Sequence, residues 1–393
     1  MGAVCCRSEV FAANNEPQEE ELIRFFMVGM GGAGKSTVIR QLMKLCIECP
    51  QSYKMYDSEW NEKQSVHSEA DLRKWKLIIQ HNILESFCKT IQQCRLFGIS
   101  FPDEQKKIVD EIEKLCGDVR TLHLRKQEWT SAFNEQLGNK LVTLIDNDKV
   151  SQSFQCHMIT KGTGELCHFN LDPLRRTLLR SHEFSADCRL SDGAPHFLNR
   201  DKILSYSRDD TLPTEEDIVH ARDPTSGLNY YHFRVHKMRI ELHDMGGQMV
   251  ERQKVLDFLT HWISDSKPNY RNFVLYVTSM AEYNVLHPDN PQYTLLDESA
   301  AFMKMILNLS QVQECGFLIF FNKSDIFEER VSDPMLKPDF RKFLGRFIKE
   351  GDLKKYEQGN VVKVEVLRKA IASKFADTVN SVVVKRRAPV YHR

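Results

Sequence analysis

The chain has 393 residues, of which 41% are hydrophobic and 27% are charged. A chain of this length exceeds one ordinary core, so two domains are expected. The 54 basic residues balance the 54 acidic ones, which gives no indication of a nucleic-acid partner or a strongly acidic substrate. The sequence shows neither the apolar core of a signal peptide nor a run long enough to span a membrane. The 11 cysteines are scattered, so we expect reduced thiols in a cytosolic setting.

The first residues read Met-Gly-Ala-Val-Cys-Cys-Arg-Ser. Gly2 is the acceptor for N-myristoylation once Met1 is removed, and Cys5 and Cys6 are candidates for palmitoylation. One acyl chain binds a membrane only marginally, whereas two bind it stably. We therefore predict that residues 1–20 form a lipidated segment that anchors the protein to a membrane.

Strands and helices alternate over much of the chain. The apolar run at 22–28 predicts a buried strand, and helical spacing begins at Ser36. Further helices are predicted at 69–101, 104–116 and 128–146, whereas 147–187 has little periodicity and is interpreted as an irregular insert. The last part of the chain predicts strands at 232–235, 238–243, 272–278, 316–321 and 360–366, and helices at 250–263, 294–309, 335–350 and 367–386.

This pattern indicates an α/β fold with a mostly parallel sheet. We expect the α/β domain to occupy residues 21–55 and 216–393. A mainly helical domain at 56–215, which includes the insert, interrupts it.

A phosphate-binding loop is predicted between the first strand and the first helix. Residues 29–37 read Gly-Met-Gly-Gly-Ala-Gly-Lys-Ser-Thr, which matches the pattern G-x-x-x-x-G-K-S. Backbone N–H groups of such a loop surround phosphate oxygens, the lysine neutralises β/γ-phosphate charge, and the serine hydroxyl reaches Mg²⁺. We expect the nucleotide to contact Gly29, Gly32, Ala33, Gly34, Lys35, Ser36 and Thr37. The loop predicts a nucleoside triphosphate without choosing between ATP and GTP.

A second motif favours guanine. An apolar strand at 317–321 leads into Asn322, Lys323 and Asp325, the pattern N-K-x-D. The carboxylate of Asp325 can accept hydrogen bonds from both N1–H and the 2-amino group of guanine. Adenine lacks this pair of donors and would leave a buried carboxylate unpaired. Lys323 can lie over the base and the ribose.

Two more segments carry residues suited to the γ-phosphate and the metal ion. Asp244, Gly247 and Gln248 follow a predicted strand, where they can hold a magnesium-bound water, meet the γ-phosphate and orient the attacking water, respectively. Thr225 can supply a second hydroxyl to Mg²⁺, and Arg222 lies three residues before it. The predicted metal ligands are therefore Ser36, Thr225 and, through water, Asp244.

Together these motifs resemble those of the alpha subunits of heterotrimeric G proteins. The resemblance covers most of the chain and includes the stretch 190–199 with Asp192, which is similar to the segment that approaches the nucleotide from the family's helical domain. It implies a Ras-like GTPase domain with an inserted all-α domain, and it adds Val219, His220 and Ala221 to the nucleotide contacts. It also implies that Arg222 is an arginine finger supplied in cis, that Gln248 positions water, and that Glu298 and Arg252 pair in the GTP form.

The resemblance further implies function and partners. The family hydrolyses GTP to GDP and phosphate and passes signals from a G-protein-coupled receptor to an effector at the cytoplasmic face of the plasma membrane. Its beta-gamma dimer binds partly through a long N-terminal helix, which is short here, and through a tryptophan where this chain has Val255. The beta-gamma dimer is therefore the least supported of these partners, and no nucleic-acid partner is expected.

Two departures concern the nucleotide itself. Gly32 and Ala33 replace the family's Glu-Ser, whose carboxylate helps to latch the arginine loop, so we expect GDP release to be faster than is typical of the family. Residues 364–367 read Val-Glu-Val-Leu at roughly the place of the family's T-C-A-x motif, which normally touches the guanine ring.

Two other interpretations compete with a GTP-hydrolysing switch. One is a regulatory module that binds GTP or GDP with negligible turnover and does not couple to beta-gamma. The other is a P-loop ATPase or kinase, which the N-K-x-D motif disfavours.

Overall fold

The computed structural model describes residues 21–96, 101–117, 122, 126–145, 190–225, 227–247, 252–264, 267–287, 289–332, 351, 364–382 and 390–392. Within them, one sheet has the strand order β2-β3-β4-β1-β5-β6-β7. Its strands are β1 (Leu22–Val28), β2 (Tyr53–Tyr56), β3 (Leu228–Val235), β4 (Met238–Met245), β5 (Tyr270–Ser279), β6 (Gly316–Asn322) and β7 (Val390–His392). Strand β3 pairs antiparallel with β2 and β4, and all other neighbours pair in parallel. The predicted α/β class with a mostly parallel sheet is confirmed.

Helices pack against both faces of this sheet. In β1, Phe26 and Val28 belong to a core shared with α11 (Arg252–Ser264), α12 (Leu295–Leu307) and α16 (Val364–Val382). Met27, which lies between them, packs in a different core with Ile39 of α1 (Lys35–Glu48). This separation follows from the strand geometry, because successive side chains point to opposite faces. Helix α13 (Ser324–Ser332) starts directly after β6.

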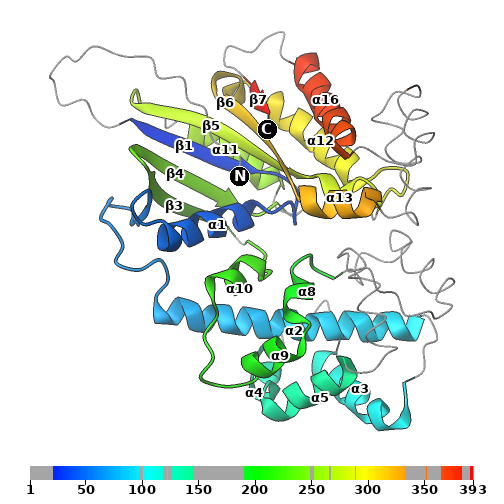
Figure 1. The fold of residues 1–393 in the computed structure, drawn as a ribbon. Coiled ribbons are helices and arrows are strands. Elements are labelled where there is room, and N and C mark those ends of the chain that lie inside the picture. Colours follow the sequence, from blue (N-terminus) through cyan, green and yellow to red (C-terminus); the bar gives the residue numbers. More distant parts are fainter. Residues whose placement is uncertain are drawn as a thin grey trace.

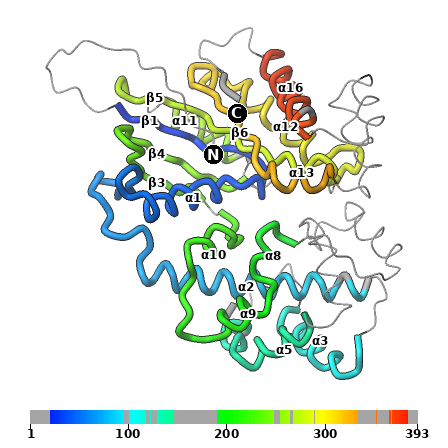
Figure 2. The backbone as a smooth tube through the Cα atoms, viewed as in Figure 1, coloured from blue at the N-terminus to red at the C-terminus, as the bar shows by residue number. Residues whose placement is uncertain are grey.

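A second, all-helical core lies beside the sheet domain. The long helix α2 (Glu69–Leu96) runs below the sheet domain in Figures 1 and 2, with the shorter helices packed against it. These are α3 (Asp103–Cys116), α4 (Lys126–Ala132), α5 (Glu135–Ile145), α8 (Ala194–Phe197) and α9 (Arg200–Tyr206). Their shared core includes the buried side chains of Phe87, Trp129, Leu141, Phe197 and Ile203. Helix α10 (Glu215–His220) follows and leads back to the sheet.

Two expectations differ from the structure, and two others lie where it describes no residues. The helix predicted at 128–146 is two helices, because the Asn134 side chain accepts hydrogen bonds from the N–H groups of Gln136 and Leu137 and starts a new helix there. The strand predicted at 360–366 is wrong for Val364–Val366, which open α16. Buried residues recur there at four-residue spacing, at Leu367, Ile371, Phe375 and Val379. The insert at 147–187 and the helix predicted at 335–350 lie outside the described residues.

The cysteines also depart from expectation. A disulfide joins Cys88 of α2 to Cys116 at the end of α3, so the expectation of reduced thiols is wrong for this pair. Cys46 is a buried thiol. Burial raises the pKa of Cys46 to about 11. In the part of the chain that the structure describes, no helix has the length and hydropathy needed to cross a bilayer.

Candidate nucleotide and magnesium site

The loop between β1 and α1 has the backbone of an anion site. Gly34 adopts φ 96° at the start of α1 and provides no side chain to cap the helix. A helix N-terminus of this kind can meet an anion through its backbone N–H groups. A Cβ on Gly34 would lie 2.1 Å from Asn322 Nδ2, and one on Gly29 would lie 2.0 Å from the Val277 carbonyl oxygen. Both positions therefore require glycine.

Lys35 places its ammonium group inside this loop. Its Nζ donates hydrogen bonds to the carbonyl oxygens of Gly29, at 2.9 Å, and Met30, at 3.2 Å. Only 6% of the residue is exposed. A buried cation encircled by backbone amides is suited to hold a phosphate.

Three oxygen-bearing side chains from distant parts of the chain meet beside the loop. Ser36 Oγ lies 2.6 Å from Thr225 Oγ1 and donates to Asp244 Oδ2 at 2.6 Å, and Thr225 Oγ1 lies 3.4 Å from the same carboxylate oxygen. Asp244 is 1% exposed, and its Oδ1 has no hydrogen-bond partner among the described residues. Burial raises the pKa of Asp244, against the opposing effects of Ser36 and Lys35.

These donors fit magnesium. Hydroxyl and carboxylate oxygens are the ligands that Mg²⁺ takes, usually few per site and together with waters and substrate phosphates. A cation would also provide the positive charge needed to balance the buried carboxylate of Asp244. Ser36 and Thr225 would hold the ion directly, and Asp244 would hold it through water.

Gly247 follows β4 and packs tightly on the phosphate loop. A Cβ at this position would lie 2.2 Å from the Gly29 carbonyl oxygen and 2.3 Å from Lys35 Nζ. The neighbouring Gln248 lies outside the described residues, so its role in orienting water stays a prediction.

Gly247→Ala is expected to weaken the binding of a non-hydrolysable GTP analogue by about tenfold, since overpacking of this size costs about 1–3 kcal/mol. The clash is expected to move Gly246 and Gly247 away from the expected position of the γ-phosphate, so GDP binding should change much less. Equilibrium titrations with both nucleotides measure the two affinities. The matched control is Gly351→Ala, where an added Cβ meets nothing within 4 Å. Equal affinities of the Gly247 variant and the wild type for the GTP analogue would contradict the prediction.

The N-K-x-D residues lie next to the phosphate loop. Asn322 Nδ2 donates to the carbonyl oxygen of Ala33 at 2.9 Å, which ties the end of β6 to the loop. Lys323 adopts φ 56° and forms an ion pair with Asp192. Asp325 lies in the first turn of α13 with an exposed side chain, so a base can reach its carboxylate. Asp192 and Lys323 therefore connect the helical part of the chain to the base-recognition motif.

The segment that carries Arg222 is anchored by residues that the sequence did not single out. The Arg222 N–H donates to Asn82 Oδ1 at 2.7 Å, and the Arg222 carbonyl oxygen accepts from Asn82 Nδ2 at 2.9 Å. The Arg222 side chain is exposed. Arg40 of α1 donates to the carbonyl oxygens of Ile218 and Ala221. No sequence signal marks Asn82, which is one polar residue within a 28-residue helix.

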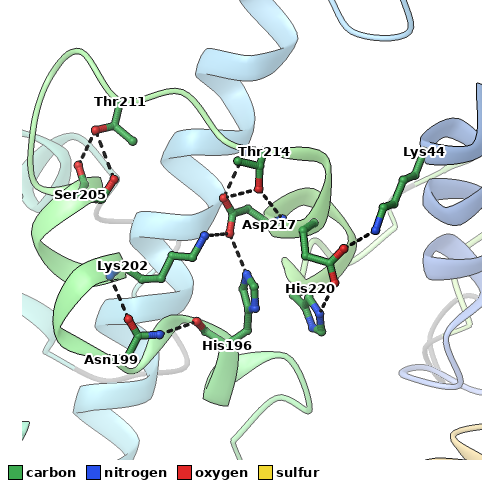
Figure 3. Close-up of polar contacts among 10 residues, drawn as sticks. Lys44, His196, Asn199, Lys202, Ser205, Thr211, Thr214, Asp217 and His220 are labelled. Carbon is green, nitrogen blue, oxygen red and sulfur yellow. Dashed lines mark hydrogen bonds and ion pairs between the residues drawn. The ribbon is translucent and has the colours of Figure 1, made fainter. Parts of the chain in front are cut away.

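Asp217 is the centre of a polar cluster on α10 (Figure 3). It accepts from Lys202 Nζ at 2.5 Å and from Thr214 Oγ1 at 2.7 Å, and its Oδ1 lies 2.7 Å from His196 Nε2. The His196 ring stacks on His220 with centroids 4.2 Å apart. On the other side of α10, Lys44 of α1 forms an ion pair with Glu216. Burial alone would raise the pKa of Asp217, but the hydrogen bonds from Lys202, Thr214 and His196 outweigh it and hold the pKa well below its usual range.

Asp217→Asn is expected to destabilise the protein at pH 7 by about 3 kcal/mol, since it removes one partner of a buried ion pair. The folded-state pKa is lower than the unfolded value of about 3.9, so the charge stabilises the fold above about pH 4. This contribution is lost as pH falls toward the folded-state pKa. Urea unfolding should therefore show a large difference between variant and wild type at pH 7 and a smaller one at pH 3. Asp201→Asn, at an exposed position of α9, is the control. A difference that grows on acidification would refute this account.

The remaining predicted residues are placed as follows. Val219 and Ala221 are buried at the end of α10, and their nucleotide contacts, like that of His220, stay predictions. Glu298 Oε1 lies 3.1 Å from His287 Nε2, and the Arg252 side chain is not among those that the structure describes. Gly2, Cys5 and Cys6 also lie outside the described residues.

Comparison of the sequence with known proteins identifies a family of guanine nucleotide-binding proteins. A family model described as G-protein alpha subunit matches residues 8–393. The chain is 24% identical over 335 residues to the guanine nucleotide-binding protein alpha-6 subunit of Caenorhabditis briggsae, covering 85% of this chain and 75% of that protein. It is 25% identical to guanine nucleotide-binding protein subunit alpha-15 of Mus musculus, over 84% of this chain and 70% of the relative. It is also 25% identical to the G(o) subunit alpha of Locusta migratoria, over 82% and 73%. Because the family model spans nearly the whole chain, the protein belongs to the G-protein alpha subunit family.

Proposed function

We propose that this protein binds GDP and GTP with Mg²⁺ and hydrolyses GTP slowly, so that it acts as a timed molecular switch. One observation carries the proposal. Ser36, Thr225 and Asp244 converge within hydrogen-bond distance, beside a loop that already encloses the Lys35 ammonium group. These oxygen atoms and the lysine suit a magnesium-bound triphosphate. Asn322 connects the phosphate loop to the N-K-x-D motif, whose Asp325 carboxylate can accept hydrogen bonds from guanine.

The catalytic roles belong to the protein's own residues. Arg222 would stabilise the charge that develops during phosphoryl transfer, and Gln248 would orient the attacking water. Both roles are established for the G-protein alpha family. Magnesium supplies charge neutralisation at the β- and γ-phosphates when it is bound. The nucleotide would contact the loop residues 29–37, Asp192, Val219 to Arg222, Asp244, Gly247, Asn322, Lys323 and Asp325.

The signalling role follows from family membership. We propose that the protein receives a signal from a G-protein-coupled receptor and passes it to an effector at the cytoplasmic face of the plasma membrane. Acyl chains on Gly2 and on Cys5 or Cys6 would anchor it there. Binding of a beta-gamma dimer is the least supported of these interactions, since Val255 is buried in the sheet core rather than displayed on the surface. The proposed domains are a Ras-like domain at 21–55 and 216–393 and a helical domain at 56–215.

Nucleotide selectivity and single-turnover hydrolysis test the proposal together. GTP and GDP should displace a fluorescent guanine nucleotide, and ATP should not. Preloaded GTP should then be hydrolysed slowly, and Gln248→Leu should slow it further. Displacement by ATP would support a P-loop ATPase instead. Equal hydrolysis by wild type and Gln248→Leu would support a binding module with negligible turnover.

A further inference from the structure

The main chain around Arg222 is held from both sides by side chains that are not part of the nucleotide motifs. From the sheet domain, Arg40 of α1 donates to the carbonyl oxygens of Ile218 and Ala221. From the helical domain, Asn82 of α2 bonds both polar groups of Arg222. The main chain from Ile218 to Arg222 therefore lies between α1 and α2 and is hydrogen-bonded to both helices.

The Asn82 contact is specific to the peptide groups of one residue. Its amide oxygen accepts from the Arg222 N–H at 2.7 Å, and its amide nitrogen donates to the Arg222 carbonyl oxygen at 2.9 Å. Asn82 is 5% exposed, so water cannot easily replace either bond. A side chain that bonds both the N–H and the carbonyl oxygen of one residue fixes the position and the orientation of that residue's main chain.

Two further contacts hold the helical part of the chain close to this segment, one through α2 and one through the start of α8. The Arg40 guanidinium lies over the ring of Trp75, with its carbon 4.6 Å from the ring centroid. Trp75 precedes Asn82 by two helical turns and lies on the same face of α2. A Cβ on Gly193, at the start of α8, would lie 1.9 Å from the His220 carbonyl oxygen. The helical domain therefore packs directly on the backbone that precedes Arg222.

The phosphate loop has no acidic side chain that could hold Arg222. Residues 30–34 read Met-Gly-Gly-Ala-Gly and include no carboxylate to hold an arginine. Among the described residues, Asn82 bonds the N–H and the carbonyl oxygen of Arg222, and Arg40 bonds the turn before it. The Glu85 carboxylate, one turn after Asn82 on α2, interacts electrostatically with Arg222.

We propose that Asn82 is a positioning residue for Arg222, and that it ties the arginine to the helical domain. Hydrolysis therefore requires that α2 stays packed against the segment that carries Arg222. This inference rests on the proposed function, because Asn82 acts only through Arg222.

Asn82→Ala tests the inference by single-turnover hydrolysis of preloaded GTP. The rate should fall about tenfold, since a shift of the reacting groups by about 1 Å costs up to about 100-fold. The same substitution in an Arg222→Ala background should change the rate by less than about twofold, because no arginine remains to be positioned. A merely structural role would give the same fold reduction in both backgrounds. The control is Asn139→Ala, which should behave as wild type. Asn139 is exposed on α5, and its side chain donates to the Glu135 carbonyl oxygen of the same helix.

Several outcomes separate this inference from the proposed function. A wild-type rate in Asn82→Ala, or an undiminished effect in the Arg222→Ala background, overturns the inference while GTP hydrolysis by the wild type stands. Failure of the wild type to hydrolyse GTP overturns the proposed function, and the inference with it. If the alanine variant fails to bind nucleotide, Asn82→Asp preserves the shape and sets a carboxylate oxygen against the Arg222 carbonyl. The same rate loss is then expected, and a wild-type rate would overturn the inference.

Discussion

Lys35→Met is expected to weaken the binding of GDP and GTP by roughly 100-fold, as loss of charge-assisted hydrogen bonds worth about 3 kcal/mol would do. Methionine keeps most of the aliphatic volume, so the loss reports the charge rather than the packing. The ammonium group lies within the loop, 2.9 Å from the Gly29 carbonyl oxygen, where the β- and γ-phosphates are expected. Isothermal titration with GDP in the presence of Mg²⁺ gives the affinities directly.

A matched control makes this result specific. Lys74→Met removes the same charge from an exposed position of α2 and should leave affinity unchanged. Thermal unfolding without nucleotide should show that the Lys35 variant is folded. GDP affinity within twofold of the wild type would show that the loop does not hold phosphate through Lys35.

The fold was predictable where the signal is local and contiguous. The run at 22–28, the strands ending near Asp244 and Asn322, and the helix after the phosphate loop follow from patterns within single segments. Strand β2 was missed, because its four residues, Tyr-Lys-Met-Tyr, alternate too briefly to stand out. It forms through pairing with β3, a partner about 180 residues away in the sequence.

The ambiguity at 360–366 has a related cause. A short apolar stretch such as Val-Glu-Val-Leu fits a strand or the first turn of a helix, and only the later spacing of buried residues decides between them. In the structure, Leu367 and Ile371 face the core together. The helix therefore begins before the point at which its periodicity becomes readable.

The candidate site divides in the same way. Lys35, Ser36, Asp244 and Asn322 belong to motifs whose residue types and spacing indicate their chemistry. Asn82 belongs to no motif, and its partner Arg222 is 140 positions away. Its contact depends on the packing of the helical domain against the returning chain, which no local pattern encodes. Residues that position a catalytic group through its main chain leave no such trace in a single sequence.

Arg222→Ala is expected to reduce single-turnover GTP hydrolysis by about 10³-fold, with GTP affinity changed by less than about tenfold. The magnitude is the one established for an arginine finger in this family and its relatives. The position supports it, since Thr225, three residues further along the chain, lies with its Oγ1 3.4 Å from Asp244 Oδ2, and Asn82 holds the Arg222 main chain in place. Because the exposed guanidinium is not needed to build the loop, the loss should appear in the rate rather than in binding.

Two variants make this expectation discriminating. Arg222→Lys keeps the charge but loses the planar fork that matches phosphate oxygens, so it should recover only part of the rate. Arg73→Ala removes an arginine whose side chain is 71% exposed and pairs within α2, and it should hydrolyse GTP as the wild type does. Hydrolysis by Arg222→Ala at the wild-type rate would mean that the transition-state charge is stabilised by another group. In that case the positioning of Arg222 by Asn82 would also have no effect on hydrolysis.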